Sequence, residues 1–359
     1  MQKEELDEAD DLLGIDNLTE SHDNNPEQKY IHYQYVADKG QSLLRVDKFL
    51  MDRIEGVSRN KIQQAAEADC ILVNDKPVKS SYKIKPLDKV ALVMDRPRME
   101  LQITPENIPL NIFYEDDDLL IINKPPGLVV HPGHGNYTGT LVNAIAYHLR
   151  DMQNFDADDP RLGLVHRIDK DTSGLLIVAK NPYVKTYLAK QFLNKTIKRE
   201  YVALVWGSLE NNDGIIKENI GRDLKNRLLM RVFPTEEHGK PAVTHYNIVE
   251  RLGYVTLINC QLETGRTHQI RVHMKHIGHT LFNDERYGGN KILRGKNTTK
   301  YKQFVRKCFE KCPRQCLHAQ TLGFKHPTTE KEMMFTSELP DDMLSVIEKW
   351  RIYNQSNEL

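Results

Sequence analysis

The segment that most restricts the fold of this chain is residues 164–176, LVHRIDKDTSGLL. A short apolar run ends in a charged cluster, and a Thr-Ser-Gly turn then leads into a second apolar run. The pattern predicts a strand that delivers Arg167, Asp169 and Asp171 to the edge of a folded core, where Gly174 permits a sharp turn. Alternation along an extended strand would place Arg167 and Asp169 on the same face.

The arginine and aspartates of this segment are open to two interpretations. A carboxylate beside a cation keeps its charge, because the cation favours the ionised form. An ionised carboxylate can be a nucleophile, but it can equally be one half of a structural ion pair in a strand-turn-strand unit. Residues 164–176 alone do not decide between the two, so the decision rests on the remainder of the chain.

Length and composition indicate a protein of more than one domain without membrane contact. No apolar run reaches the roughly 18 residues of a membrane span, and the N-terminus is acidic rather than signal-like. Five cysteines, an odd number, favour reduced thiols over a disulfide framework. We therefore expect a cytoplasmic protein.

The formal net charge of zero conceals an acidic N-terminus and a basic body. Residues 1–28 carry ten acidic residues and one lysine, whereas the other 331 residues carry 49 basic and 40 acidic residues. Residues 1–30 have few aromatics and no sustained period, which predicts a disordered acidic tail. The moderately basic body fits a nucleic-acid partner without requiring one.

Residues 43–95 are predicted to form a compact module. Two amphipathic helical patterns precede two short apolar strands, 71–73 and 77–78, and a closing strand. The segments RVDKFL, SRNKIQQAAEADCILVND and KIKPLDKVAL, in this order, resemble the S4 RNA-binding domain. The resemblance implies a small α/β domain that contacts RNA.

In S4 domains, basic residues of the two helices face RNA phosphates, and the resemblance carries this role to five positions. These are Arg45, Lys48, Arg59, Lys61 and Lys79. Such contacts give salt-sensitive affinity without sequence preference, although a solvated helix face explains any single lysine equally well. S4 domains usually have glycine at three turn positions that other residues occupy here, so we expect these turns to be made differently. The three are Asp69, Asp75 and Leu87.

Residues 96–110 contain three prolines and no clear period, which predicts a linker. The larger unit that follows, residues 111–355, contains seven motifs: NKPPGLVVHPG, HRIDKDTSGLL, KREYVALVWG, GKPAVTHY, LETGRTHQIRVHM, RYGG and LHA. Their type, order and spacing closely resemble the RluA family of RNA pseudouridine synthases. With an S4-like module in front, the chain is most similar to members that act on the ribosomal large subunit.

The resemblance implies an α+β fold in which the catalytic domain has a mixed, mainly antiparallel sheet. It also implies a reaction, in which a uridine in RNA is cut at its glycosidic bond and its base rotates and rejoins through C5. The family uses no cofactor and no metal for this reaction. The expected partner is RNA, with clustered uridines in a stem-loop of large-subunit (23S) rRNA as substrate, and the expected state is a monomer.

The resemblance also assigns roles to site residues, position by position. Asp169 matches the family's nucleophile, and Arg271 in HQIRVH matches the basic residue that pairs with it. Arg167 matches the arginine that fills the gap left when the target uridine is flipped out. Tyr201 matches the aromatic residue that stacks on the flipped base, and it is a candidate for removing the C5 proton. Ile270 is expected to line the base pocket.

One motif departs from the family pattern, because Asn283 stands before Asp284 where a glycine is usual. Asparagine tolerates the left-handed backbone, so we expect the turn to survive. Residues 291–314, with nine basic residues and one acid, match a region that varies within the family. The sequence leaves the role of this basic segment open.

The histidines and cysteines of the C-terminal half do not predict a metal site. His268 and His273 lie near no cysteine and fit no common zinc spacing. Three cysteines repeat every four residues, but Pro313 argues against one unbroken helix, and the repeat differs from a CxxC knuckle. We expect these three thiols to be buried against the core. They are Cys308, Cys312 and Cys316.

Two other functions fit part of the sequence. Asp169, Asp171 and Thr172 also match the DxDT pattern of haloacid-dehalogenase-like phosphotransferases, but that chemistry needs Mg²⁺ and a purely apolar strand before the motif. A non-catalytic assembly factor that binds rRNA through the S4-like module is the other alternative. The filled active-site positions favour the synthase, in which Asp171 becomes a structural residue.

Overall fold

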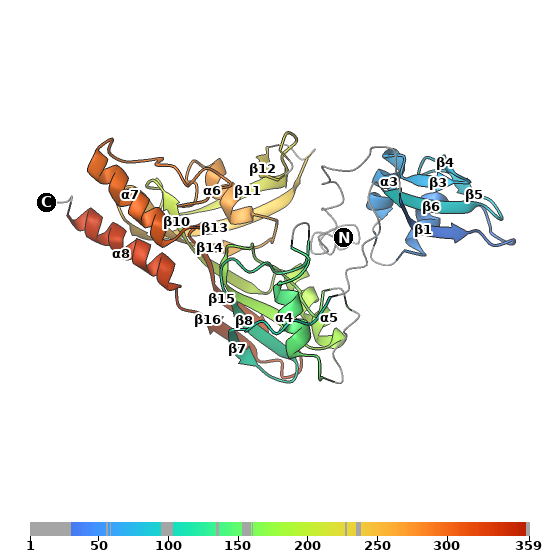
Figure 1. Cartoon of the computed structure of the whole chain (residues 1–359), viewed down its shortest axis with the longest axis horizontal. Coiled ribbons are helices and arrows are strands. Elements are labelled where there is room, and N and C mark those ends of the chain that lie inside the picture. Colours follow the sequence, from blue (N-terminus) through green and yellow to red (C-terminus); the bar gives the residue numbers. More distant parts are fainter. Residues whose placement is uncertain are drawn as a thin grey trace. The chain divides into compact units, whose positions relative to one another are not determined.

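The computed structural model describes most of the chain, as Figure 1 shows. The described residues are 30–54, 57, 59–94, 103–133, 136–152, 159, 161–226, 228–234 and 238–356. The predicted acidic tail up to residue 29 and residues 96–102 of the predicted linker lie outside them. Contacts divide the chain into two compact units, Met1–Gln102 and Ile103–Leu359.

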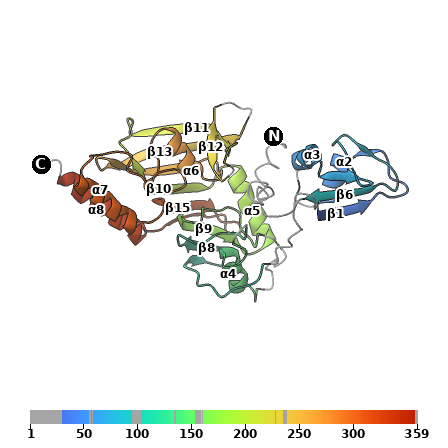
Figure 2. The ribbon, with the colours of Figure 1, turned by 45° about the horizontal axis from the view of Figure 1, so that its top comes forward.

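In its described residues, the first unit contains an antiparallel sheet with strand order β1-β6-β3-β4, two helices, and a short ladder of β2 and β5. Its elements are β1 (Tyr30–Val36), β2 (Leu44–Arg45), α2 (Val46–Met51), α3 (Arg59–Glu67), β3 (Ile71–Val73), β4 (Lys76–Pro77), β5 (Lys83–Ile84) and β6 (Lys89–Met94). Both helices lie on one side of the sheet (Figure 2), because their apolar faces share one core with it. Val46, Phe49 and Leu50 of α2, at helical spacing, are fully buried in that core.

Three turns of the first unit use left-handed backbone at residues other than glycine. Asp69 (φ 53°), Asp75 (φ 62°) and Leu87 (φ 66°) hold the conformation that glycine adopts freely. The expectation that these turns are made differently from glycine turns is therefore wrong. A leucine in this region costs roughly 1–2 kcal/mol, and its turn is held by a hydrogen bond from Leu87 N to Ala37 O at 3.0 Å.

The second unit is built on one sheet with strand order β12-β11-β13-β14-β10-β15-β9-β8-β7, in which β16 also pairs with β15. Its strands are β7 (Ile112–Glu115), β8 (Leu119–Lys124), β9 (Ser173–Ala179), β10 (Lys198–Trp206), β11 (Asp213–Arg222), β12 (Met230–Phe233), β13 (Lys240–Arg251), β14 (Val255–Leu262), β15 (Leu317–Lys325) and β16 (Glu332–Thr336). Within the described residues, β9 and β15 form the one parallel pair, and the other pairs are antiparallel. This arrangement confirms the predicted α+β fold with a mainly antiparallel sheet.

Helices pack on both faces of this sheet (Figure 2). They are α4 (Leu141–His148), α5 (Pro182–Leu193), α6 (Gln269–His276), α7 (Thr299–Lys311) and α8 (Asp341–Gln355). Because side chains alternate along a strand, β10 supplies Ala203 and Val205 to the core under α4 and α6, and Leu204 and Trp206 to the core under α7 and α8. Helix α5 packs on a third cluster, formed by β8, β9 and β15.

The residues before β9 differ from the prediction, because residues 165–172 form no regular strand. The buried side chain of His166 explains the difference. Its Nε2 accepts a hydrogen bond from the backbone N–H of Ile177 in β9, at 3.0 Å. The imidazole thus accepts the hydrogen bond of a β9 backbone N–H that would otherwise go to a backbone carbonyl of a neighbouring strand. Arg167 and Asp169 consequently project from an irregular loop rather than from alternate positions of a strand.

Gly174 has a different role from the one predicted. It lies inside β9 with φ 118°, at the parallel pairing with β15. A Cβ atom at this position would lie 2.1 Å from the carbonyl oxygen of Ala319. Glycine is required here because the two strand backbones approach each other closely, and not because the chain turns sharply.

Candidate active site

Asp169 and Arg271, which are distant in the sequence, form an ion pair. Asp169 Oδ2 accepts a hydrogen bond from Arg271 Nη1 at 2.8 Å. Two other nitrogens of the same guanidinium, Nε and Nη2, donate to the buried carboxylate of Asp284 at 2.7 and 2.9 Å. The bidentate pair with Asp284 fixes the guanidinium plane, and Nη1 is left to orient Asp169.

Arg271 lies in the first turn of α6, and the start of this helix is anchored to β13. Gln269 Nε2 donates to Val243 O and to Thr244 Oγ1, at 2.9 and 3.0 Å. Gln269 Oε1 accepts from Thr264 Oγ1 at 2.8 Å. With its amide satisfied on both sides, Gln269 holds the first turn of α6 in one position, and Arg271 with it.

The surroundings of Asp169 keep its carboxylate ionised. Burial alone would raise the pKa of this group, but nearby positive charge outweighs burial and lowers the pKa to about 2. At neutral pH this charge belongs to Arg271 and Arg167, because burial lowers the pKa of the neighbouring His268 to about 4 and leaves its ring neutral. A deprotonated carboxylate held by a fixed guanidinium is in the form that a nucleophile requires.

The loop that carries Asp169 is held from one side by Lys124, whose side chain is fully buried. Its Nζ donates to three backbone carbonyl oxygens, among them Lys170 O at 2.8 Å. Burial lowers the pKa of Lys124 to about 7, against the opposing effect of the charges of Asp171 and Asp169. The lysine thus joins the NKPPG motif to the residue that follows Asp169.

Arg314 holds the other side of the same loop. Its Nη1 donates to the backbone carbonyl of Asp171 at 3.0 Å, and its Nη2 donates to Ser173 Oγ at 3.3 Å. The guanidinium is itself fixed by Asp342 at the start of α8, with distances of 2.8 Å from Nε and 2.9 Å from Nη2. Asp171 contributes its main chain to this network, which supports the prediction that it is a structural residue.

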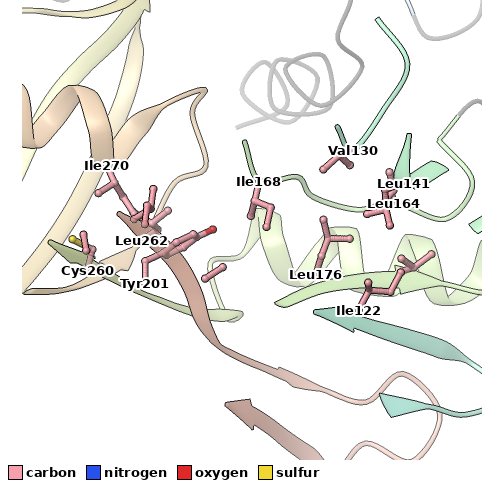
Figure 3. Packing of buried hydrophobic residues seen from close by; sticks show 14 of the residues in the cluster. Ile122, Val130, Leu141, Leu164, Ile168, Leu176, Tyr201, Cys260, Leu262 and Ile270 are labelled. Atoms are coloured by element: carbon pink, nitrogen blue, oxygen red, sulfur yellow. The ribbon is translucent and has the colours of Figure 1, made fainter. Parts of the chain in front are cut away.

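Tyr201 lies on β10, opposite Cys260 of β14, and is buried. Figure 3 shows its ring beside Leu262 and Ile270, with the hydroxyl directed toward Ile168. Burial, and more weakly the negative charge of Asp169, raises the pKa of the phenol, so the side chain is neutral at pH 7. Tyr201 and Ile270 therefore form an apolar wall next to the loop that carries the carboxylate.

Arg167 differs from the other predicted site residues of the second unit because its side chain is exposed. Within the described part of the chain it forms no ion pair, although its charge lowers the pKa of Asp169. The residues on either side of it, His166 and Ile168, are buried. The backbone is thus fixed at this point, while the guanidinium remains available to a ligand.

Three residues around Arg271 were not predicted as site residues. They are His268, Asp284 and Tyr287. Asp284 follows Asn283, whose φ of 58° confirms the predicted left-handed turn. Tyr287 lies in the same turn, with its hydroxyl 2.7 Å from Nδ1 of His268 and its ring centroid 5.0 Å from the Arg271 guanidinium carbon. Residues 284–289, DERYGG, follow Asn283 directly. An aspartate and a tyrosine in a turn do not indicate, from the local sequence, that their partner is an arginine of another segment.

The predicted RNA contacts of the first unit include two arginines with a structural role. Arg45 and Arg59 contact the buried carboxylate of Asp47 at 2.9 and 3.1 Å. Burial opposes ionisation of Asp47, but the hydrogen bonds from Arg45, Gln63 and Arg59 lower its pKa to about 2. Both arginine side chains stay partly exposed, at 39% and 44%. The other predicted positions are Lys48 and Lys79, which are exposed, and Lys61, whose side chain lies outside the described residues.

Metal-ligating residues do not gather in the described part of the chain, where no group of three or more histidine, cysteine, aspartate or glutamate side chains could hold an ion. His273, for example, lies 2.9 Å from Thr244 Oγ1. The prediction of buried thiols is confirmed for three cysteines in the core under α7 and α8. They are Cys308, Cys312 and Cys316. Among the described helices, none is both long and apolar enough to cross a membrane.

Comparison with known proteins identifies the family. A family model described as RNA pseudouridylate synthase matches residues 118–276, and a model described as S4 domain matches residues 44–90. The chain is 49% identical over 317 residues to an uncharacterized RNA pseudouridine synthase of Chlorobaculum parvum, which covers 88% of this chain and 96% of that protein. It is 40% identical over 308 residues to ribosomal large subunit pseudouridine synthase D of Nitrosomonas europaea, which covers 86% and 85% respectively.

A solved structure agrees at the level of the fold. Human RNA pseudouridylate synthase domain containing 4 matches with a TM-score of 0.51 at 21% identity, over 67% of this chain and 93% of that one. The phosphotransferase and the non-catalytic assembly factor find no support in these matches. The chain belongs to the family of RNA pseudouridine synthases, carries an S4 domain, and isomerises uridine to pseudouridine in RNA.

Proposed function

We propose that the substrate is a set of clustered uridines in a stem-loop of large-subunit rRNA, and that Asp169 is the nucleophile. The observation that carries the assignment of Asp169 is its ion pair with Arg271 at 2.8 Å, beside the apolar wall of Tyr201 and Ile270. The relative named for the ribosomal large subunit and the S4 domain support the substrate class.

In the proposed reaction the Asp169 carboxylate forms a bond to the target nucleotide, and the C1′–N1 glycosidic bond breaks. The uracil rotates, a C1′–C5 bond forms, the C5 proton leaves to solvent, and cleavage of the aspartyl bond restores the carboxylate. Product and substrate are isomers, because a proton taken up at N1 replaces the one lost from C5. Arg271 favours the ionised carboxylate of Asp169 before attack and after release. Its pair with Asp284 keeps the guanidinium in the same position throughout the reaction.

Tyr201 and Ile270 are proposed to receive the flipped uracil, Tyr201 by stacking and Ile270 as part of the pocket wall. The raised pKa of Tyr201 means that its phenol is protonated at neutral pH, which favours stacking over a direct role as base. Tyr201→Phe separates the two roles, because it keeps the ring and removes the hydroxyl. Loss of conversion with unchanged RNA affinity would assign removal of the C5 proton to the hydroxyl.

Arg167 is proposed to hold the RNA open. Extruding a base costs about a few kcal/mol in lost stacking and pairing, and a planar guanidinium can occupy the gap by stacking on the neighbouring bases. Its exposed side chain, between the buried His166 and Ile168, fits such a contact. Because Asp169 lies two residues further along the same loop, insertion of Arg167 and delivery of the nucleotide to Asp169 would occur together.

The S4 domain is proposed to bind rRNA phosphates through its exposed basic side chains, including Lys48 and Lys79. We propose that the protein acts as a monomer, since Asp169, Arg271, Asp284 and Tyr201 already make the described contacts within a single chain.

Mapping of pseudouridines in rRNA tests the proposed substrate. Large-subunit rRNA from cells without this protein should lack a cluster of pseudouridines that the wild-type copy restores and an Asp169→Asn copy does not. An unchanged rRNA pattern in the deletion strain would reject large-subunit rRNA as the substrate, although the chain would still belong to the synthase family.

A further inference from the structure

Helix α7 is the ordered centre of the basic segment 291–314, and the proposed reaction does not use it. The helix begins after Thr298, whose Oγ1 accepts a hydrogen bond from Tyr301 N at 3.3 Å. Tyr301, Val305 and Cys308 form its buried face and pack in the cluster that also contains residues of α8. Figures 1 and 2 show α7 and α8 side by side. This packing fixes which face of α7 is exposed.

The exposed face of α7 carries a line of lysines. Lys300, Lys307 and Lys311 are exposed and follow one another at intervals of seven and four residues. Such intervals place them on one stripe of the helix, and a rise of 1.5 Å per residue separates them by about 10 and 6 Å along the axis. We call these three residues the lysine row.

The charge of the lysine row is not compensated by the protein. In the described part of the chain none of the three lysines forms an ion pair. The single acid of the segment, Glu310, pairs with Arg306 at 3.4 Å, with both side chains largely exposed. An exposed pair of this kind contributes about 0–1 kcal/mol. Glu310 is three residues from Lys307 and adjacent to Lys311, but its ion pair is with Arg306. The three lysines therefore face solvent without an ion-pair partner in the described part of the chain.

Asn283 ties α7 to the turn that positions Arg271. Its Nδ2 donates to the carbonyl oxygens of Phe309 and Cys312, at 3.2 and 2.7 Å, which caps the C-terminal end of α7. The next residue, Asp284, is the bidentate partner of Arg271. The end of the lysine row is therefore fixed relative to the catalytic ion pair, and a glycine at position 283 would lack the side chain that makes this connection.

We infer that the lysine row is a second RNA-binding surface of the catalytic unit. It holds phosphates of the rRNA away from the target nucleotide, because α7 packs on the face of the sheet opposite Tyr201 and Ile270. The inference rests on the proposed function, since it needs an RNA substrate that extends beyond the flipped base. Lysine ammonium groups are compact point charges that suit phosphate oxygens, and the row contains no planar group that would read a base edge. The contact therefore adds affinity without sequence preference, and it does so independently of the S4 domain.

The test compares two triple variants of the full chain. Lys300→Gln/Lys307→Gln/Lys311→Gln removes the row. The control, Lys190→Gln/Lys217→Gln/Lys331→Gln, removes three exposed lysines, one each from α5, β11 and the turn before β16. Binding to an in vitro transcript of large-subunit rRNA is measured between about 50 and 200 mM KCl, a range over which phosphate contacts lose affinity steeply. Pseudouridine formation is measured under single-turnover conditions at saturating RNA.

For the row variant we expect affinity to fall by about 10- to 100-fold and the slope of log K against log salt to decrease by about 2 to 3, as for three lost phosphate contacts. The rate at saturating RNA should be unchanged, and the control should match the wild type in both measurements. A wild-type slope in the row variant, an equal loss in the control, or preferential binding of the row to anionic vesicles would overturn the inference. A wild-type protein that converts no uridine in the transcript would instead reject the proposed substrate.

Discussion

Replacing Arg271 with lysine separates the charge of this residue from its geometry. The guanidinium reaches two carboxylates at once, with Nη1 on Asp169 and with Nε and Nη2 on Asp284. A lysine ammonium keeps the positive charge but has one nitrogen, which cannot hold both carboxylates in this arrangement. Asp284 is fully buried, whereas the side chain of Asp169 is 19% exposed. We expect the lysine to stay with the buried carboxylate and to release Asp169.

The size of the effect follows from the contact that is lost. A hydrogen bond to a charged group is worth about 1.5–3 kcal/mol. If this energy orients Asp169 for attack, its loss lowers the rate of the chemical step by about 10- to 150-fold, since about 1.36 kcal/mol corresponds to a factor of ten. RNA affinity should stay unchanged, because the buried guanidinium is placed to bind Asp169 and Asp284 rather than the RNA backbone.

The assay is pseudouridine formation under single-turnover conditions, with the folded fraction of each variant checked by circular dichroism. Lys275→Gln is the matched control, because Lys275 lies one turn further along α6 and is exposed. It removes a positive charge near Tyr287 without touching either carboxylate. A folded Arg271→Lys variant with the wild-type rate would refute the view that Arg271 orients the nucleophile.

Three further predictions concern the catalytic site and the pairing of β9 with β15. Arg271→Gln removes the charge that offsets burial of Asp169, so the pKa of Asp169 should rise from about 2. The acid limb of the kcat/KM profile should therefore move to higher pH, and an unmoved limb would contradict this cause. Arg314→Lys should lower kcat about tenfold and leave KM unchanged, because it loses roughly one hydrogen bond to the loop that carries Asp169. A change in KM alone would assign Arg314 to binding. Gly174→Ala places a Cβ 2.1 Å from Ala319 O, so the variant should not accumulate as folded protein, and a wild-type melting temperature would show that the strands can separate.

The part of the site that the sequence predicts lies in long motifs. Asp169, Tyr201 and Arg271 each sit in a run of residues whose order and type resemble the synthase family, and the structure brings all three into one site. The left-handed turn at Asn283 was predictable for a simpler reason, since asparagine tolerates that backbone. Local chemistry and motif order suffice at these positions.

The residues that position the site could not be predicted, because their partners are distant in sequence. Arg314 lies in a basic segment, where a solvent-exposed side chain is the simplest expectation. It is instead buried between Asp342 and the loop that carries Asp169. The periodicity of residues 164–168 predicts a strand, but the imidazole of His166 replaces a backbone partner and leaves a loop. In both places a side chain makes a hydrogen bond that the local sequence pattern assigns to the backbone or to water.

The decisive measurement for Asp169 is the single-turnover conversion of uridine by Asp169→Asn, compared with wild type on the same large-subunit rRNA transcript. Asparagine has nearly the same shape and can still accept a hydrogen bond from Arg271, but it has no carboxylate to form a bond with the nucleotide. We predict no detectable pseudouridine, with RNA binding intact. Conversion at a rate near that of the wild type would show that Asp169 is not the nucleophile.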